Sequence, residues 1–128
     1  MSNNSSQTIR QFNVFKDLND EDAQLLARFV QEKKFPSNAP LLRAGQICPH
    51  VYLLLSCQAE EVKLDNSKKL LSTGAVIGAR EILEGKPMSA DFIISQEGSA
   101  LMIPGTALEE LILLSPTLAA ALHQSLNS

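Results

Sequence analysis

Apolar residues are spaced as in a helix near the start of this chain. The positions that recur at helical spacing are Ala23, Leu25, Leu26, Phe29 and Val30, which predicts a helix over residues 20–31. Asn19 offers a side-chain oxygen as its N-cap, and the acidic residues 20–22 suit the positive end of the helix dipole. Lys33 and Lys34 suit the opposite end of the same helix.

The spacing becomes strand-like from Phe35 onward, where short apolar runs alternate with turns rich in Pro, Gly and Asn. These runs lie at 41–42, 51–55, 62–64, 70–71, 92–94 and 100–103. Turns are expected at 65–67 and 96–98. Several short strands separated by such turn signals are typical of a β-sandwich or jelly roll.

Helical signals return near the end of the chain. Thr106 and Glu109 have the spacing of a capping box, and Ser115 followed by Pro116 predicts a second helix start. Leucines then recur every four residues along 116–126. Before the first helix, an apolar lead-in over 9–18 predicts a short helix or turn. We expect a flexible tail over 1–11 and one domain over 12–128.

Composition narrows the possible functions. Apolar residues make up 45% and aromatic residues 5% of the chain, so the predicted core is aliphatic. A net charge of −3 argues against binding to nucleic acid or to an anionic membrane. No apolar run approaches the roughly 20 residues of a membrane span, and the polar start has no signal-peptide pattern. Cys48 and Cys57 flank one predicted strand too far apart for a disulfide, which favours a reducing, cytoplasmic setting.

Residues 74–92 combine a turn, a short helix, a second turn and a strand. Two glycines, Gly74 and Gly78, allow a sharp entry into the loop, because glycine has no Cβ. Residues 79–84 can form about one and a half helical turns, whose free amide groups would suit an anion. Gly85 and Pro87 are expected to end this helix.

This layout resembles the phosphate-binding cassette of the cyclic-nucleotide-binding domain. In that family, Gly-Glu opens the short helix and Pro-Arg-[Ala/Ser]-Ala closes the loop. The matching positions are Gly78, Gly85, Pro87, Ser89 and Ala90. The resemblance covers residues 12–126 and implies a mainly β fold with flanking helices, a double-stranded β-helix (jelly roll), of the kind found in catabolite-activator-like sensor domains.

Two cassette positions depart from the pattern. The family's glutamate, which accepts from the ribose hydroxyl, falls on Ala79, and its phosphate-binding arginine falls on Met88. Each lost charge-assisted hydrogen bond is worth ~1.5–3 kcal/mol, so both together weaken binding by roughly 10²–10⁴-fold. The flexible Met88 thioether can also fill the pocket. The vestigial ligand-binding set is Gly78, Ala79, Arg80, Glu81, Ile82, Pro87, Met88, Ser89 and Ala90.

Arg80 leaves two alternatives open. It can supply the missing positive charge from a new direction, with help from Ser89 and the backbone amides. It can instead form an i,i+4 surface pair with Glu84 or contact Glu81.

Other candidate sites are weak. Cys48, His50 and Cys57 lack the spacing of a metal site. His123 is expected to be a surface side chain on the last helix. No nucleophile elbow or Walker loop is present. We therefore expect no enzymatic activity, no metal and no cofactor.

The sequence favours a non-catalytic regulatory or protein-interaction module that does not bind cyclic AMP or cyclic GMP in the family's usual way. The apolar stripe on the last helix comprises Leu118, Ala119, Leu122 and Leu126. This stripe either covers the roll or forms a seam for a homodimer or a partner helix. The expected partner is another protein or an output domain. The alternative is a genuine small-ligand sensor, including the sensor half of a larger transcription or signalling protein.

Overall fold

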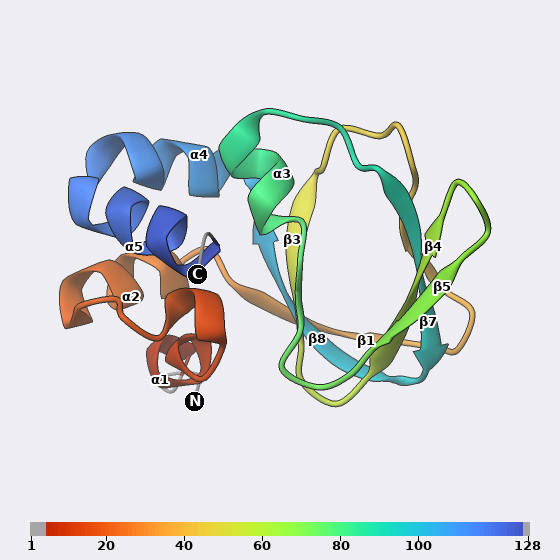
Figure 1. Cartoon of the computed structure of the whole chain (residues 1–128). Helices are drawn as coiled ribbons and strands as arrows, with labels where there is room; N and C mark the ends of the chain where they lie inside the picture. The colour runs from red at the N-terminus through yellow and green to blue at the C-terminus, as the bar shows by residue number, and fades with distance from the viewer. Residues whose placement is uncertain (1–4, 127–128) are drawn as a thin grey trace.

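The computed structural model describes residues 5–126, in which two four-stranded antiparallel sheets face each other as a roll (Figure 1). In order across the first sheet are β1 (Gln31–Phe35), β8 (Gly98–Pro104), β3 (His50–Leu54) and β6 (Val76–Ile77). In order across the second are β2 (Pro40–Leu42), β7 (Ala90–Gln96), β4 (Gln58–Lys63) and β5 (Lys68–Leu71). The predicted mainly β fold with flanking helices is confirmed.

Helices gather on one side of the roll (Figure 1). They are α1 (Ser5–Arg10), the 3₁₀ turn η1 (Asn13–Phe15), α2 (Asp20–Ala27), α4 (Gly105–Leu114) and α5 (Pro116–Leu126). The short helix α3 (Ala79–Glu84) lies between this helical layer and the roll. No single helix among residues 5–126 is long and apolar enough to cross a bilayer, and α4 with α5 reaches that length only as a pair bent by 114°.

The predicted tail over residues 1–11 differs from the structure. Residues 1–4 lie outside the described residues, but Ser5–Arg10 forms α1. Ile9 is fully buried in the core beside Phe12 and Phe15. Burying these apolar side chains stabilises a short helix that would be marginal alone.

Strand β3 separates two apolar clusters. Val51 and Leu53 belong to the cluster beneath the helices, whereas Tyr52 and Leu54 belong to the cluster inside the roll. Successive side chains of a strand point to opposite faces, so both faces of β3 are buried. This explains why its sequence is continuously apolar rather than alternating.

The first predicted helix is shorter than expected. Its N-cap is confirmed, because the Asp22 N–H donates to Asn19 Oδ1 at 2.8 Å. The helix ends at Ala27 instead of residue 31, and Gln31–Phe35 forms β1, paired with β8. Lys33 and Lys34 therefore lie on an exposed edge strand, where charged side chains discourage pairing with other chains.

The two C-terminal helix starts had different outcomes. The predicted capping box at Thr106 is wrong: α4 begins at Gly105, and no side chain caps it. The Gly105 N–H instead donates to the Pro49 carbonyl oxygen at 2.9 Å, so the loop before β3 satisfies the helix start. The second start is confirmed, because Ser115 Oγ accepts from the Leu118 N–H at 3.2 Å.

Candidate functional site

Helix α3 begins and ends at left-handed glycines, as its sequence predicts. Gly78 has φ 101° and Gly85 has φ 67°. A Cβ on Gly78 would lie 2.6 Å from Cys48 Sγ, so this position has no room for a side chain. The entry to α3 is therefore fixed by local backbone chemistry and by close packing against Cys48.

The two departures from the family pattern are both buried. Ala79 and Met88 are each 2% exposed. Met88 packs among the roll-interior residues, which include Leu42 and Tyr52. Its N–H donates to the Gln46 carbonyl at 2.8 Å, and its own carbonyl accepts from the Gly45 N–H at 2.7 Å. Neither side chain brings a charge to the cassette.

A cavity of about 260 Å³ lies between α3 and the roll; we call it the cassette cavity. It is lined by Glu61, Lys69, Leu71, Val76, Ile77, Gly78, Ala79, Arg80, Glu81 and Phe92. The structure thus brings together four of the predicted site residues, at positions 78–81. The others, Ile82, Pro87, Met88, Ser89 and Ala90, do not line this cavity.

Sequence reasoning missed Glu61 and Lys69. They stand opposite each other in the β4–β5 register, as do Ala59 and Leu71. Because alternate residues share a face, the buried Ala59 places Glu61 on the inner face of the roll. The sequence did contain a signal, because alternate residues 59 and 61 of a strand share a face. Which face is the inner one, and that Lys69 lies opposite Glu61, became known only from the pairing of β4 with β5.

Arg80 lines the cassette cavity and also pairs within α3. Its Nη1 lies 3.5 Å from Glu84 Oε2, and both side chains are partly exposed. The i,i+4 pair proposed from the sequence is therefore present. An exposed pair of this kind contributes about 0.3–0.5 kcal/mol.

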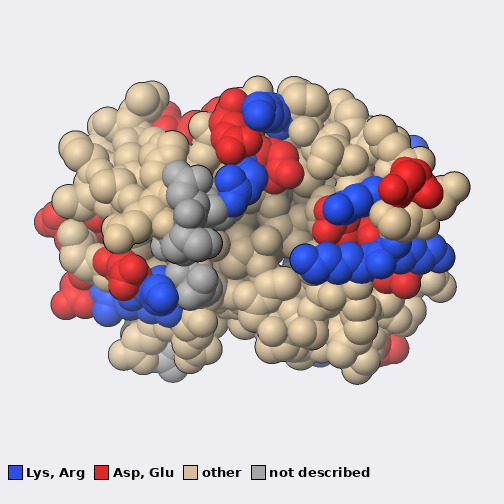
Figure 2. Space-filling model, viewed as in Figure 1, with Lys and Arg blue, Asp and Glu red and all other residues tan. Residues whose placement is uncertain are grey.

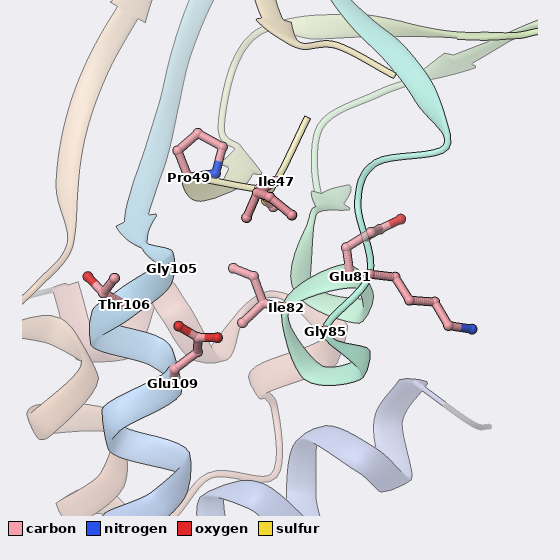
Figure 3. A pocket seen from close by; sticks show the side chains of 10 residues that line it. Ile47, Pro49, Glu81, Ile82, Gly85, Gly105, Thr106 and Glu109 are labelled. Atoms are coloured by element: carbon pink, nitrogen blue, oxygen red, sulfur yellow. The ribbon is translucent and has the colours of Figure 1, made fainter. Parts of the chain in front are cut away.

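A second cavity, of about 380 Å³, lies between α3 and α4 (Figure 3); we call it the interhelical pocket. It is lined by Ile47, Cys48, Pro49, Glu81, Ile82, Gly85, Lys86, Gly105, Thr106 and Glu109. Burial, and then the negative charge of Glu81, raise the pKa of the Cys48 thiol to about 11, and a hydrogen bond with the His50 backbone partly opposes this shift. Cys48 is therefore a neutral wall residue at physiological pH.

The remaining candidate sites contribute little chemistry. Cys48 and Cys57 are free and buried. Within residues 5–126, no group of three or more His, Cys, Asp or Glu side chains could hold a metal ion. His123 is exposed, as predicted. On the face shown in Figure 2, basic and acidic side chains lie interspersed.

The apolar stripe of α5 points inward in the described part of the helix. Leu118 and Leu122 are buried in the cluster beneath the helices, and Ala119 is half-buried. The side chain of Leu126 lies outside the described residues. Among the alternatives for this stripe, its geometry matches a helix that covers the core.

Comparisons with known proteins agree with this architecture. Residues 32–114 match the family model of the cyclic nucleotide-binding domain. A search among curated proteins found no match.

Solved structures give the same fold at identities below 25%. The regulatory subunit of a cAMP-independent protein kinase A from Trypanosoma cruzi, bound to guanosine, is 23% identical with a TM-score of 0.77; the match covers 88% of this chain and 40% of that one. A cyclic nucleotide-binding protein from Geobacter metallireducens GS-15 is 20% identical with a TM-score of 0.85, covering 94% and 91%. The catabolite activator protein of Thermus thermophilus is 22% identical with a TM-score of 0.73, covering 90% and 56%. Because the family match spans more than half of the sequence, this chain belongs to the cyclic nucleotide-binding domain family.

Proposed function

We propose that this chain is a non-catalytic regulatory module that does not hold cyclic AMP or cyclic GMP through the family's usual contacts. The observation that carries the proposal is the burial of Met88, 2% exposed inside the roll, where the resemblance places a phosphate-binding arginine. The module then acts through a protein partner or an output domain.

The charges around the cassette cavity support this proposal. Lys69 and Arg80 bring two positive charges, and Glu61 and Glu81 bring two negative ones, so the charged lining is neutral overall. Arg80 is also engaged by Glu84. A cyclic phosphate would thus meet no net positive field and no bidentate guanidinium at position 88.

The alternative function is a sensor of a different small ligand. The cassette cavity favours it, since about 260 Å³ stays open between α3 and the roll. The Trypanosoma cruzi relative was solved with guanosine, an uncharged nucleoside. In this chain the polar contacts would come from Arg80, Lys69 and the backbone amides of α3, because Ser89 does not line the cavity.

The relatives suggest how such a module would be used. The chain spans 40% of the length of the kinase regulatory subunit and 56% of the catabolite activator. A role as the sensor half of a larger transcription or signalling protein is compatible with these proportions. The two free, buried cysteines fit a reducing compartment, and we place the protein in the cytoplasm.

Calorimetric titration with cyclic AMP, cyclic GMP and cyclic dinucleotides tests the proposal. We expect dissociation constants of about 1 mM or weaker, given the roughly 10²–10⁴-fold loss from two missing charge-assisted hydrogen bonds. A dissociation constant below ~100 μM that Arg80→Ala abolishes would favour the sensor instead. Lys34→Ala, on the exposed edge of β1, is the matched control for loss of one positive charge.

A further inference from the structure

The interhelical pocket has apolar walls from two separate segments. Ile47 and Pro49 come from the loop before β3, and Ile82 comes from α3 (Figure 3). Ile47 is 73% exposed, so most of its side chain is open to contact from a partner. The pocket therefore offers an apolar surface that residues 5–126 do not themselves cover.

Two carboxylates line this pocket from different helices. Glu109 extends from α4 toward Ile82, whereas the Glu81 side chain extends from α3 away from Glu109 (Figure 3). Within residues 5–126, neither carboxylate takes part in an ion pair. The basic lining residue, Lys86, has its Nζ 3.6 Å from Glu84 Oε1, so its charge is directed to a carboxylate outside the pocket lining.

The backbone amides at the start of α4 are poorly placed to attract an anion into the pocket. The Gly105 N–H already donates to the Pro49 carbonyl at 2.9 Å. Glu109 lies one helical turn further along and adds negative charge near the helix start. The pocket as a whole is apolar with an acidic side.

We propose that the interhelical pocket binds an arginine side chain presented by a partner protein. The aliphatic stem of arginine can pack on Ile47 and Ile82 while its head stays at the polar side. Its planar guanidinium can donate two parallel hydrogen bonds to the Glu109 carboxylate. The inference rests on the proposed role as an interaction module, and it adds the partner's chemistry and its docking site.

The probe for this site is N-acetyl-arginine methylamide, titrated into the ¹⁵N-labelled full chain. Ligands of this size reach dissociation constants on the order of 1 mM. We expect saturable amide shifts at Gly85, Gly105 and Thr106. The citrulline analogue has the same shape without the charge, and we expect it to bind at least about tenfold more weakly.

Single substitutions locate the binding. Glu109→Gln should weaken the arginine probe about three- to fivefold, as expected for loss of one partly exposed ion pair. Glu110→Gln, an exposed neighbour on the same helix, should leave the affinity unchanged. Ile47→Ser should weaken the arginine probe and the citrulline analogue alike, because it removes the apolar contact.

Equal affinity for both probes, no effect of Glu109→Gln, or shifts confined to the cassette cavity would each overturn the arginine site. A failed arginine titration leaves the proposed loss of cyclic nucleotide binding standing. Tight binding of cyclic AMP would overturn that function while the arginine titration still reports on the interhelical pocket.

Discussion

At the scale of single residues, the cassette depends on a close contact between Cys48 and Gly78. Gly78 leaves room for the Cys48 sulfur, since any Cβ there would approach it to 2.6 Å. The same burial raises the pKa of Cys48 to about 11, with Glu81 adding to the effect. A cysteine that reads as a small apolar residue in the sequence is thus also a titratable group linked to folding.

We predict that Cys48 destabilises the protein in alkaline solution. Below the ordinary cysteine pKa of 9.0, the thiol is neutral in both the folded and the unfolded chain, and its contribution to stability is complete. As pH rises from 9 toward 11, the unfolded chain ionises first, and about 1.4 kcal/mol of unfolding free energy is lost per pKa unit. Urea unfolding at pH 7, 9 and 10.5 measures this loss.

The control is Cys48→Ala, whose unfolding free energy should fall less steeply above pH 9. In a Cys57→Ala background, we also expect slow alkylation of folded Cys48 by iodoacetamide at pH 8. Rapid alkylation at that pH would contradict a neutral, buried thiol.

At the scale of elements, a buried carboxylate joins helices α2 and α5. Asp22 is 3% exposed and accepts hydrogen bonds from Ser115 Oγ, at 2.8 Å, and from Thr117 Oγ1. Ser115 Oγ also caps α5. Asp22 carries one of the acidic charges that the sequence predicts at the start of α2. Its hydrogen-bond partners lie more than 90 positions away, so the sequence did not indicate its second role, the link to α5.

We predict that Asp22→Ala lowers the unfolding free energy by about 1–3 kcal/mol, because it leaves buried hydroxyls without their acceptor. Glu21→Ala, at the exposed neighbouring position, should change it by less than about 0.5 kcal/mol. Chemical denaturation measures both. In the Asp22→Ala/Ser115→Ala double variant, strictly additive losses would argue against the direct coupling.

At the scale of the whole molecule, the roll positions α3 over the cassette cavity with Ala79 and Met88 at the two departing positions. The antiparallel sheets and flanking helices agree with the fold of the similar solved structures. Met88 contributes to the roll interior instead of to a polar site. Scaffold and ligand chemistry are therefore separable in this chain.

We predict that Ala79→Glu with Met88→Arg increases affinity for cyclic AMP by roughly 10²–10⁴-fold, restoring the two charge-assisted contacts. Without ligand, this double variant should melt at a lower temperature, because a charge replaces a buried apolar side chain. Cyclic AMP should then raise its melting temperature by mass action. The control Met88→Leu keeps the apolar packing and should not bind cyclic AMP more tightly. If the double variant folds but does not bind cyclic AMP more tightly, positions 79 and 88 are not the family's glutamate and arginine positions.

Local signals allowed several features to be predicted from the sequence. Gly78 and Gly85 bounded α3, and Asn19 and Ser115 capped their helices. Each depends on backbone conformation or on a hydrogen bond within a few residues, so the relevant physics is contained in a short segment. The alternation of apolar runs and turns likewise indicated the roll, because the strand period is a local property.

Tertiary structure decided the features whose partners are distant in the chain. Residues 31–34 are polar and exposed, and with the buried Phe35 they form β1 because β8 offers a free edge with which to bond. Glu61 and Lys69 became cavity residues through strand pairing, and the Thr106 cap was displaced by a carbonyl from the loop before β3. Periodicity and capping propensity describe one segment at a time, whereas burial, pairing and cavity lining are set by which segments fold against each other.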